Sequence, residues 1–394
     1  MKCHVCKQDS AVEFLNLGQQ PLANKYPTEA EFVGEDFFQL SVYFCTTCKN
    51  VQLGTVVSRE RMFVDYYYLS SVNQKLVQHF EEFAQTLESA KFVVDVGSND
   101  GILLKPLKAL GVKALGVDPS VNVGKIANDA GLETIVSFFD SPTAQKIARE
   151  YGKADVIVAS SIFTHLEDPH SFVDAVKELM QDDGAFIIEV EYIGNIIAGV
   201  QFERFYLDRI FYYSLSSLKH LFEMHEMYIS DVEMIEPHGG SLRVTARNQS
   251  RRAPVSVGVT EFLTKEETAL TLPKLQEFKN TVDAYLTAFR EKLEGYKNAG
   301  LKVAGYSAPA RVSTICNYGH IGPELIEFIV DDSPLKQHRS SPGTHIPIVP
   351  KEHLEVHKAD VLVVFAYEYF DAIKEKTKGG PWRYLIPIPP REVE

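Results

Sequence analysis

The strongest chemical signal in the chain is a glycine turn at residues 97–101, which reads Gly-Ser-Asn-Asp-Gly. Residues 92–96 before it are apolar and partly β-branched, which predicts a buried strand. A helical pattern follows, and a second apolar run ends on Asp118, about twenty residues after the first glycine. A strand, glycine turn, helix, strand and acid in this order bind an adenosine-bearing ligand. The glycines admit the ligand, and the acid accepts hydrogen bonds from its ribose.

The composition of the turn indicates which adenosine ligand it suits. A dinucleotide site has the pattern G-x-G-x-x-G, which places a pyrophosphate on the helix N-terminus. The middle glycine is missing here, and Asn99 and Asp100 lie in the turn. We therefore expect a cationic ligand without phosphates, S-adenosylmethionine, with a dinucleotide as the alternative. Two phenylalanines after the third expected strand can flank the adenine or fill the core. The expected cofactor-binding residues are Asp95, Gly97, Ser98, Asn99, Gly101, Asp118, Phe138, Phe139 and Ser160.

Four of the five cysteines form two Cys-x-x-Cys pairs, Cys3 with Cys6 and Cys45 with Cys48. Two thiolates on one tight turn reach a tetrahedral ion together, so two such turns close a four-sulfur shell around zinc. A closed shell leaves no open position, so we expect a structural and not a catalytic metal. Unrelated thiols or a redox pair are the alternatives. The span between the pairs must hold a loop, expected around residues 21–34.

Size and charge limit the class of protein. A chain of 394 residues is long enough for two or three domains. The formal net charge of -13 argues against broad nucleic-acid binding. No apolar run approaches the length of a membrane span, and the N-terminus lacks the apolar core of a signal peptide. We expect a cytoplasmic protein without nucleic-acid or membrane partners, as a monomer or weak homo-oligomer.

The motifs are separated by apolar runs that alternate with helical patterns, which predicts an α/β protein with parallel, doubly wound sheets. An aromatic insertion at 202–213 interrupts the first series of strands, and a second Rossmann-like pattern starts near residue 302. The strands expected in a central seven-stranded sheet are 92–96, 114–117, 134–136, 155–159, 185–190, 229–235 and 242–246.

Several motifs, in one order along nearly the whole chain, resemble those of the three-domain, zinc-binding sugar C-methyltransferases that act on nucleotide-linked 4-keto sugars. The resemblance implies a zinc-binding domain at 1–65, an S-adenosylmethionine-binding methyltransferase domain at 66–250 and a C-terminal α/β domain at 251–394 that helps to bind the nucleotide sugar. The matching segments are the two cysteine pairs with residues 14–23 between them, the turn at 97–101, His-Gly-Gly-Ser-Leu-Arg at 238–243, Gly-Tyr-Ser-Ala-Pro-Ala-Arg at 305–311, and Pro-Gly-Thr-His-Ile-Pro-Ile at 342–348.

The family's catalytic motif, Tyr-His-Glu-His, corresponds here to Tyr-Leu-Asp-Arg at 206–209. The tyrosine is kept, the acid is shortened, and Arg209 stands where the family has the histidine commonly taken as the base. The family's Asn-Asn-Val-x-x-His after the fourth strand appears as residues 160–165, which keep the histidine, His165. A C-terminal Trp-Asn pair of the family appears as Ala366 and Tyr367.

Methylation of the C3 carbon beside a C4 ketone needs a base for the C3 proton and a donor for the enolate oxygen. His165 is a candidate base, and Asp208 is either the base or a group that orients one. Tyr206 can donate to the carbonyl oxygen. Arg209 cannot be a base at ordinary pH, but it can stabilise an enolate or bind phosphate. His238, before a Gly-Gly turn, is an alternative base.

The implied substrate is a nucleotide-diphosphate sugar, whose charge needs cationic partners. Three other classes of function stay open on the sequence: an O- or N-methyltransferase, an NAD-dependent sugar oxidoreductase or epimerase, and a non-catalytic zinc-anchored binding protein. The candidate substrate-binding residues are Tyr68, Arg243, Arg311, Lys336 and Arg339.

Overall fold

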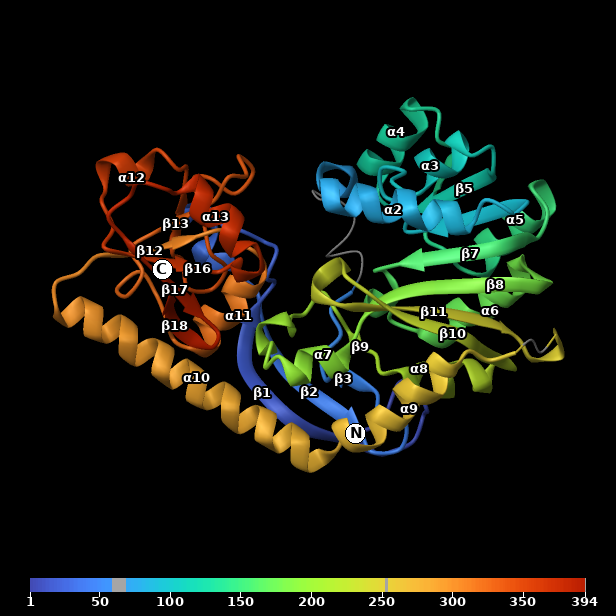
Figure 1. Ribbon diagram of the computed structural model, residues 1–394, viewed down its shortest axis with the longest axis horizontal. Coiled ribbons are helices and arrows are strands. Elements are labelled where there is room, and N and C mark those ends of the chain that lie inside the picture. Colours follow the sequence, from blue (N-terminus) through green and yellow to red (C-terminus); the bar gives the residue numbers. More distant parts are fainter. Residues whose placement is uncertain (59–68, 252–253, 394) are drawn as a thin grey trace.

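The computed structural model of the protein describes residues 1–58, 69–251 and 254–393. This part of the chain forms three β-sheets, of four, seven and seven strands, and confirms the predicted α/β class. Figure 1 shows a domain from the middle of the chain and a second domain from its C-terminal part, with the N-terminal strands and the long helix α10 (Leu272–Asn298) between and beneath them. Within the described ranges, no helix is long and apolar enough to cross a membrane.

The N-terminal unit is an antiparallel sheet whose two long strands form a hairpin. Ala11 pairs with Cys45 at one end of the hairpin and Pro21 pairs with Phe37 at the other. The loop expected at 21–34 is the tip of this hairpin, with a 3-10 helix at Glu29–Gly34. Register shifts in the pairing disturb the alternation of apolar residues, so the strands were not apparent from the sequence. The strands, in sheet order, are β1 (Ala11–Pro21), β2 (Phe37–Cys45), β3 (Val51–Leu53) and β9 (Phe211–Tyr212), the last supplied by the aromatic insertion.

The central domain contains the predicted seven-stranded sheet. Its order is β10-β11-β8-β7-β4-β5-β6, and the five strands from β8 to β6 run parallel, while β11 is antiparallel to both of its neighbours. All the strands expected from the sequence are present, with ends that differ by a few residues. They are β4 (Phe92–Val96), β5 (Lys113–Asp118), β6 (Thr134–Val136), β7 (Ala154–Ser160), β8 (Met180–Glu191), β10 (Met227–Ile235) and β11 (Ser241–Asn248).

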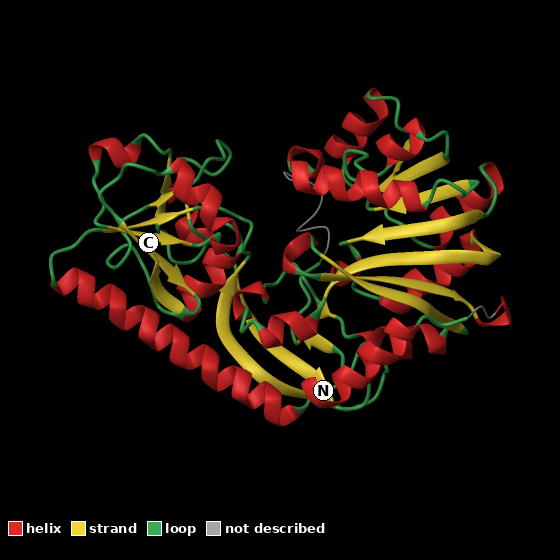
Figure 2. Cartoon of the chain, viewed as in Figure 1, coloured by secondary structure: helices red, strands yellow, loops and turns green. Residues whose placement is uncertain are grey.

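Helices cover both faces of this sheet (Figure 2). Val94 and Val96 of β4 belong to the core on one face, whereas Val93 belongs to the core on the other. Both faces are buried, which explains the continuous apolar run in the sequence. The first face is covered by α5 (Ser141–Glu150), α6 (Pro169–Leu179) and α8 (Leu215–Met224), and the second by α2 (Gln74–Thr86), α3 (Leu104–Ala109) and α4 (Val121–Asp129).

The C-terminal domain is a second Rossmann-like unit with the sheet order β14-β15-β13-β12-β16-β17-β18. Its five inner strands are parallel and its two edge strands are antiparallel. The bounds are β12 (Val303–Tyr306), β13 (Ile329–Val330), β14 (Arg339–Ser340), β15 (Pro347–Val349), β16 (Val361–Val364), β17 (Arg383–Pro387) and β18 (Pro390–Val393), with helices α11 (Arg311–Tyr318), α12 (His353–Val356) and α13 (Phe370–Lys376). The remaining helices of the described chain include α7 (Ile193–Ala198) and α9 (Val257–Ala269).

One hydrophobic core joins the N-terminal sheet to the C-terminal domain. Leu15 of β1, Phe205 of the insertion, Phe289 of α10 and Ile315 of α11 belong to the same buried cluster. The predicted boundary at 65/66 lies outside the described residues, and the boundary at 250/251 borders another such gap. The domain limits therefore stay predictions, while the packing ties the units together.

Candidate active site and metal centre

The four paired cysteines converge at one end of the N-terminal hairpin. Cys3 and Cys6 lie in a turn before β1, and Cys45 and Cys48 lie at the end of β2 and in the turn after it. Their sulfur atoms all lie within 4.8 Å of one another, with 3.7 Å between Cys3 and Cys48 and 3.5 Å between Cys6 and Cys45. Tetrahedral zinc with thiolate ligands needs sulfur separations of about 3.8 Å. The donor set therefore fits a structural zinc ion, as predicted.

The glycine turn forms one wall of a cavity of about 250 Å³ at the carboxyl ends of β4 and β5. Asp118 accepts hydrogen bonds of 2.9 Å from the backbone N–H groups of Asn99 and Ser120, which fixes the turn against the end of β5. Gly97 has a φ of +78°, and a Cβ atom there would lie 2.4 Å from the Ile162 side chain. A side chain at position 97 would clash with Ile162, so this conformation of the turn requires glycine.

All but two of the residues predicted to bind the cofactor line this cavity. Ser98 and Gly101 belong to the turn but are packed away from the cavity: Ser98 is buried, and a Cβ atom at Gly101 would come within 2.5 Å of Leu132. These two residues support the turn and do not face the cavity. The predicted residues that line it are Asp95, Gly97, Asn99, Asp118, Phe138, Phe139 and Ser160.

Several acidic side chains line this cavity. Burial, followed by the neighbouring Asp118 and Glu189, raises the pKa of Asp95 to about 8. Burial alone would raise the pKa of Glu189 as well, but hydrogen bonds and charges from His79 and Arg243 lower it. A cationic ligand would stabilise these carboxylates. Two phenylalanines and several acids fit S-adenosylmethionine, which supplies an electrophilic methyl group when bound.

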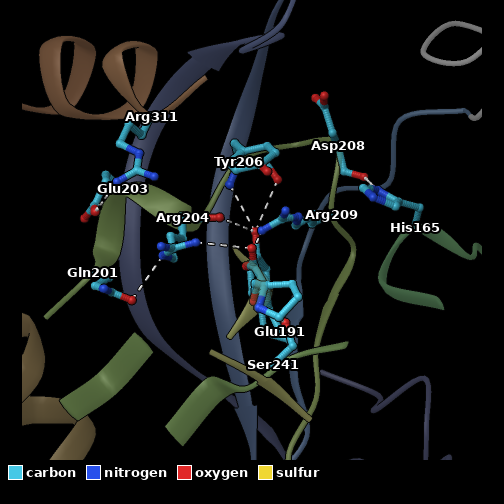
Figure 3. A network of polar contacts seen from close by, with 12 residues as sticks. His165, Glu191, Gln201, Glu203, Arg204, Tyr206, Asp208, Arg209, Ser241 and Arg311 are labelled. Atoms are coloured by element: carbon cyan, nitrogen blue, oxygen red, sulfur yellow. Dashed lines mark hydrogen bonds and ion pairs between the residues drawn. The ribbon is translucent and has the colours of Figure 1, made fainter. Parts of the chain in front are cut away.

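His165 lies on the cavity wall, in a 3-10 turn (Phe163–His165) that follows β7. Its Nδ1 hydrogen-bonds to the backbone carbonyl oxygen of Asp208 (Figure 3). A carbonyl oxygen can only accept, so Nδ1 carries the hydrogen and Nε2 of the neutral ring carries the lone pair. The contact thus sets the tautomer that a base in this position needs.

Arg209 lines the same cavity and is the one lysine or arginine among the described residues of its wall. Its guanidinium forms an ion pair with Glu191, the last residue of β8, and lies 5.0 Å from the ring centre of Tyr206. Glu191 also pairs with Arg204, at 3.2 Å. Figure 3 shows both arginines directed toward Glu191 from the aromatic insertion.

The side chain of Asp208 points away from His165 (Figure 3). Its Oδ2 accepts a hydrogen bond of 2.7 Å from Asn24, in the hairpin, and burial raises its pKa. Burial also raises the pKa of Tyr206 to about 12. Neither Asp208 nor Tyr206 is among the residues that line the cavity. The backbone of His238 lies in the 3-10 helix Pro237–Gly239, but its side chain is outside the described part of the structure.

The predicted substrate-binding cations are not gathered at one place. Arg243 is bound to Glu189 at 2.7 Å and stacks on Phe83, within the central domain. On the C-terminal domain, Arg311 pairs with Glu368 at 2.8 Å. The last two cations meet the hairpin: Lys336 lies 5.1 Å from the Tyr26 ring centre, and Arg339 donates to the Tyr26 carbonyl oxygen at 2.9 Å. Tyr68, the fifth candidate, is outside the described residues.

Several residues of the site were not predicted from the sequence. Glu189 lies near the end of the strand expected at 185–190 and Glu191 directly follows that strand, so their position at its carboxyl end was a usable signal. Arg204, in the insertion, and Glu368, in the C-terminal domain, had no such signal, because their partners are distant in the chain.

Comparisons with known proteins bear on each part of the chain. Residues 3–63 match the family described as "Putative zinc binding domain", residues 68–227 match "Methyltransferase domain", and residues 236–389 match "C-methyltransferase C-terminal domain". The chain is also 31% identical to the C-methyltransferase NovU of Streptomyces niveus over 402 residues, which cover 98% of this chain and 95% of NovU. The chain belongs to this C-methyltransferase family.

Other similarities cover less of the C-methyltransferase chain. The mitochondrial ubiquinone biosynthesis O-methyltransferase of Arabidopsis thaliana is 27% identical over 126 residues, which are 30% of this chain and 39% of that protein. The solved structure of the CcbJ methyltransferase from Streptomyces caelestis is 12% identical, with 47% of this chain and 100% of that chain covered and a TM-score of 0.36.

Family membership decides between the classes left open by the sequence. This C-methyltransferase is an S-adenosylmethionine-dependent enzyme with a zinc-binding domain, as predicted. The alternatives of an NAD-dependent oxidoreductase and of a non-catalytic binding protein are set aside.

Proposed function

We propose that this C-methyltransferase transfers a methyl group from S-adenosylmethionine to C3 of a nucleotide-linked 4-keto deoxysugar. The observation that carries the proposal is that His165 and Arg209 line the same cavity as the glycine turn and Asp118. A base and a fixed cation beside a methyl donor are what methylation next to a ketone needs. The similarity to NovU, which is named as a C-methyltransferase, supports carbon as the accepting atom.

In this mechanism Nε2 of His165 takes the C3 proton of the sugar. The electron pair of the broken C–H bond moves onto the C4 carbonyl oxygen, and the guanidinium of Arg209 stabilises the resulting enolate. The enolate carbon then forms the new bond to the methyl group as the C4 carbonyl re-forms. The bond between that methyl group and the sulfonium sulfur would break at the same time, leaving S-adenosylhomocysteine. The protonated ring of His165 keeps its Nδ1 hydrogen bond to the Asp208 carbonyl and later returns its proton to water.

The remaining predicted catalytic residues take supporting roles in the proposal. Asp208 orients His165 through its backbone, and its buried Oδ1 has no hydrogen-bond partner among the described residues. Tyr206 packs against Arg209, with 5.0 Å between the guanidinium and the ring centre, and supports its position. A role for His238 stays a prediction.

We assign nucleotide binding to the C-terminal domain, predicted at 251–394. Lys336 and Arg339 lie next to the hairpin and keep 27% and 42% of their side chains exposed, so a diphosphate can reach them. Arg311 is 14% exposed and bound to Glu368, which makes it a positioning group before it is a phosphate ligand. Arg243 is left out of the substrate site, because two carboxylates in its own domain already hold it.

The test uses a panel of thymidine, uridine and guanosine diphosphate 4-keto-6-deoxyhexoses with a ¹³C-methyl donor. We expect one of them to gain a methyl group on C3, located by NMR. In deuterated water, with S-adenosylhomocysteine in place of the donor, the same sugar should exchange its C3 proton. A methyl group on oxygen or nitrogen, or a C3 proton that survives in the product, would contradict the enolate mechanism.

A further inference from the structure

A row of alternating charges runs from the cavity wall into the C-terminal domain. Arg209 pairs with Glu191, Glu191 with Arg204, Arg204 with Glu368, and Glu368 with Arg311. Figure 3 shows the part of this row that surrounds Glu191. The row joins residues of β8, the aromatic insertion, α11 and the 3-10 helix Tyr367–Tyr369, which come from separate parts of the sequence.

Each carboxylate in the row uses its two oxygens for two different arginines. Glu191 offers Oε1 to Arg204 and Oε2 to Arg209. Glu368 offers Oε1 to Arg204 and Oε2 to Arg311. The side chain of Arg204, which belongs to both pairs, is only 7% exposed. A buried guanidinium needs charged partners, so the position of Arg204 depends on both glutamates.

The backbone beside this row leaves it little room to move. Gly239 has a φ of +78°, and a Cβ atom there would lie 2.4 Å from Nη2 of Arg204 and 2.9 Å from Oε1 of Glu368. The Gly-Gly turn at 239–240 therefore packs directly on the Arg204–Glu368 pair. Tight packing of this kind holds charged side chains in one arrangement.

We propose that Glu368 of the C-terminal domain is a positioning residue for methyl transfer, acting through Arg204 and Glu191 to hold Arg209 at the cavity wall. The inference rests on the proposed function only in assigning Arg209 to the substrate oxygen. When the charge of Glu368 is removed, Arg204 loses one of the two carboxylates that bind it in the described part of the chain. It then competes with Arg209 for both oxygens of Glu191, and Arg209 becomes free to leave its place.

The first experiment is kinetic and compares Glu368→Gln with Glu375→Gln. Glu375 is in the same domain, in an exposed ion pair with Lys378, and serves as the matched control. We expect Glu368→Gln to lower kcat about 10-fold, as small displacements of a group facing the reacting atoms do. The same factor should appear in the C3 proton exchange. The dissociation constant of S-adenosylhomocysteine, measured by calorimetry, should not change.

A double-mutant cycle separates positioning from a general structural role. If Glu368 acts through Arg209, Glu368→Gln should have little further effect on kcat when Arg209 is already replaced by lysine. Additive losses, an effect on KM alone, or a Glu368→Gln variant that behaves like the control would overturn the inference. A wild-type enzyme that methylates none of the sugars would instead count against the proposed function.

A crystal structure of the Glu368→Gln variant tests the geometry without any substrate. We expect Arg204 to bind both oxygens of Glu191 and Arg209 to be displaced from its place at the cavity wall. An Arg209–Glu191 pair unchanged from the wild type would contradict the inference, whatever the substrate proves to be.

Discussion

At the level of single residues, the cavity combines several acids with one guanidinium. We expect the acids to face the cationic cofactor and the guanidinium to face the substrate. Asp95, Asp118 and Glu189 surround the part formed by the glycine turn, where a cationic cofactor fits. Arg209 faces the cavity from the aromatic insertion and is held by Glu191. A sulfonium and a developing enolate carry opposite charges, so this arrangement suits their meeting at one place.

The first prediction concerns Asp95, whose pKa is raised to about 8 by burial and by Asp118 and Glu189. Its protonated form is favoured in the folded, cofactor-free protein. Its contribution to stability is therefore fully present below about pH 4 and is lost as the pH rises toward 8. Asp95→Asn should remove this loss and raise the melting temperature at pH 8, by about 3 °C for each kcal/mol regained.

Thermal unfolding of cofactor-free protein between pH 4 and pH 8 checks this prediction. Asp129→Asn is the control, because Asp129 is an exposed acid in the same domain. Parallel pH profiles for the wild type and Asp95→Asn would show that Asp95 is ionised throughout.

The second prediction compares His165 with Asp208, which contacts it through a backbone carbonyl. His165→Ala should lower kcat about 10²- to 10⁴-fold, the usual contribution of a general base. Asp208→Asn keeps the backbone contact and a side-chain oxygen for Asn24, so its loss should be far smaller. Initial rates with the sugar identified from the panel provide the measurement. Equal losses for the two variants would place the Asp208 carboxyl group itself in the chemistry.

At the scale of secondary structure elements, the β1–β2 hairpin links the metal centre to the C-terminal domain. The cysteines lie at one end of the hairpin, and the other end contacts the C-terminal domain. Tyr26 donates to the Ala308 carbonyl oxygen at 2.7 Å, and Phe32 stacks on His345 at 3.7 Å. The hairpin thus places Asn24 and Tyr26 beside the proposed substrate site.

The third prediction is that Cys45→Ser loses zinc and destabilises this hairpin. Cys45 ends β2 opposite the first residue of β1, so the metal fixes both strand ends at once. Metal binding and folding are coupled at such sites. Metal analysis should find one zinc per wild-type chain and clearly less in the variant, together with faster proteolysis of the N-terminal region. Cys316→Ala, which removes a cysteine outside the cluster, should keep its zinc. Well-folded wild-type protein with little zinc would contradict the prediction.

At the scale of the whole molecule, the shared core makes the N-terminal sheet and the C-terminal domain depend on each other. Phe14 of β1 lies 6.3 Å from Phe278 of α10 and also 6.3 Å from Phe205 of the insertion, measured between ring centres. These three buried rings connect the N-terminal sheet, the central domain and the helix that leads into the C-terminal domain.

The fourth prediction is that Phe14→Ala destabilises the C-terminal domain as well as the sheet that carries it. Removal of a buried phenylalanine ring costs about 3–5 kcal/mol. The single tryptophan, Trp382, lies in the C-terminal domain and reports its unfolding by fluorescence. We expect the Trp382 transition to move to lower denaturant concentration in Phe14→Ala and to stay in place in Phe37→Ala, where the ring is 44% exposed. An unchanged Trp382 transition in Phe14→Ala would show that the domains unfold separately.

Features that depend only on neighbouring residues could be predicted from local patterns in the chain. The glycine turn, the acid at the end of β5 and the paired cysteines are local patterns, in which the chemistry and the backbone conformation are encoded by the same few residues. The strands of the central sheet were predictable for the same reason, because strands buried on both faces read as continuous apolar runs.

The role of the aromatic insertion depends on packing between distant elements and could not be predicted from its own residues. In the packed molecule, Arg209 of the insertion pairs with Glu191, and the Asp208 side chain faces Asn24. Strand β9 of the insertion pairs with β3 of the N-terminal sheet. Each of these contacts joins residues that are distant in the chain, and it forms because packing brings their elements together. The direction of a side chain in such a segment has no local period or turn signal, so the packed molecule alone determines which groups reach the cavity.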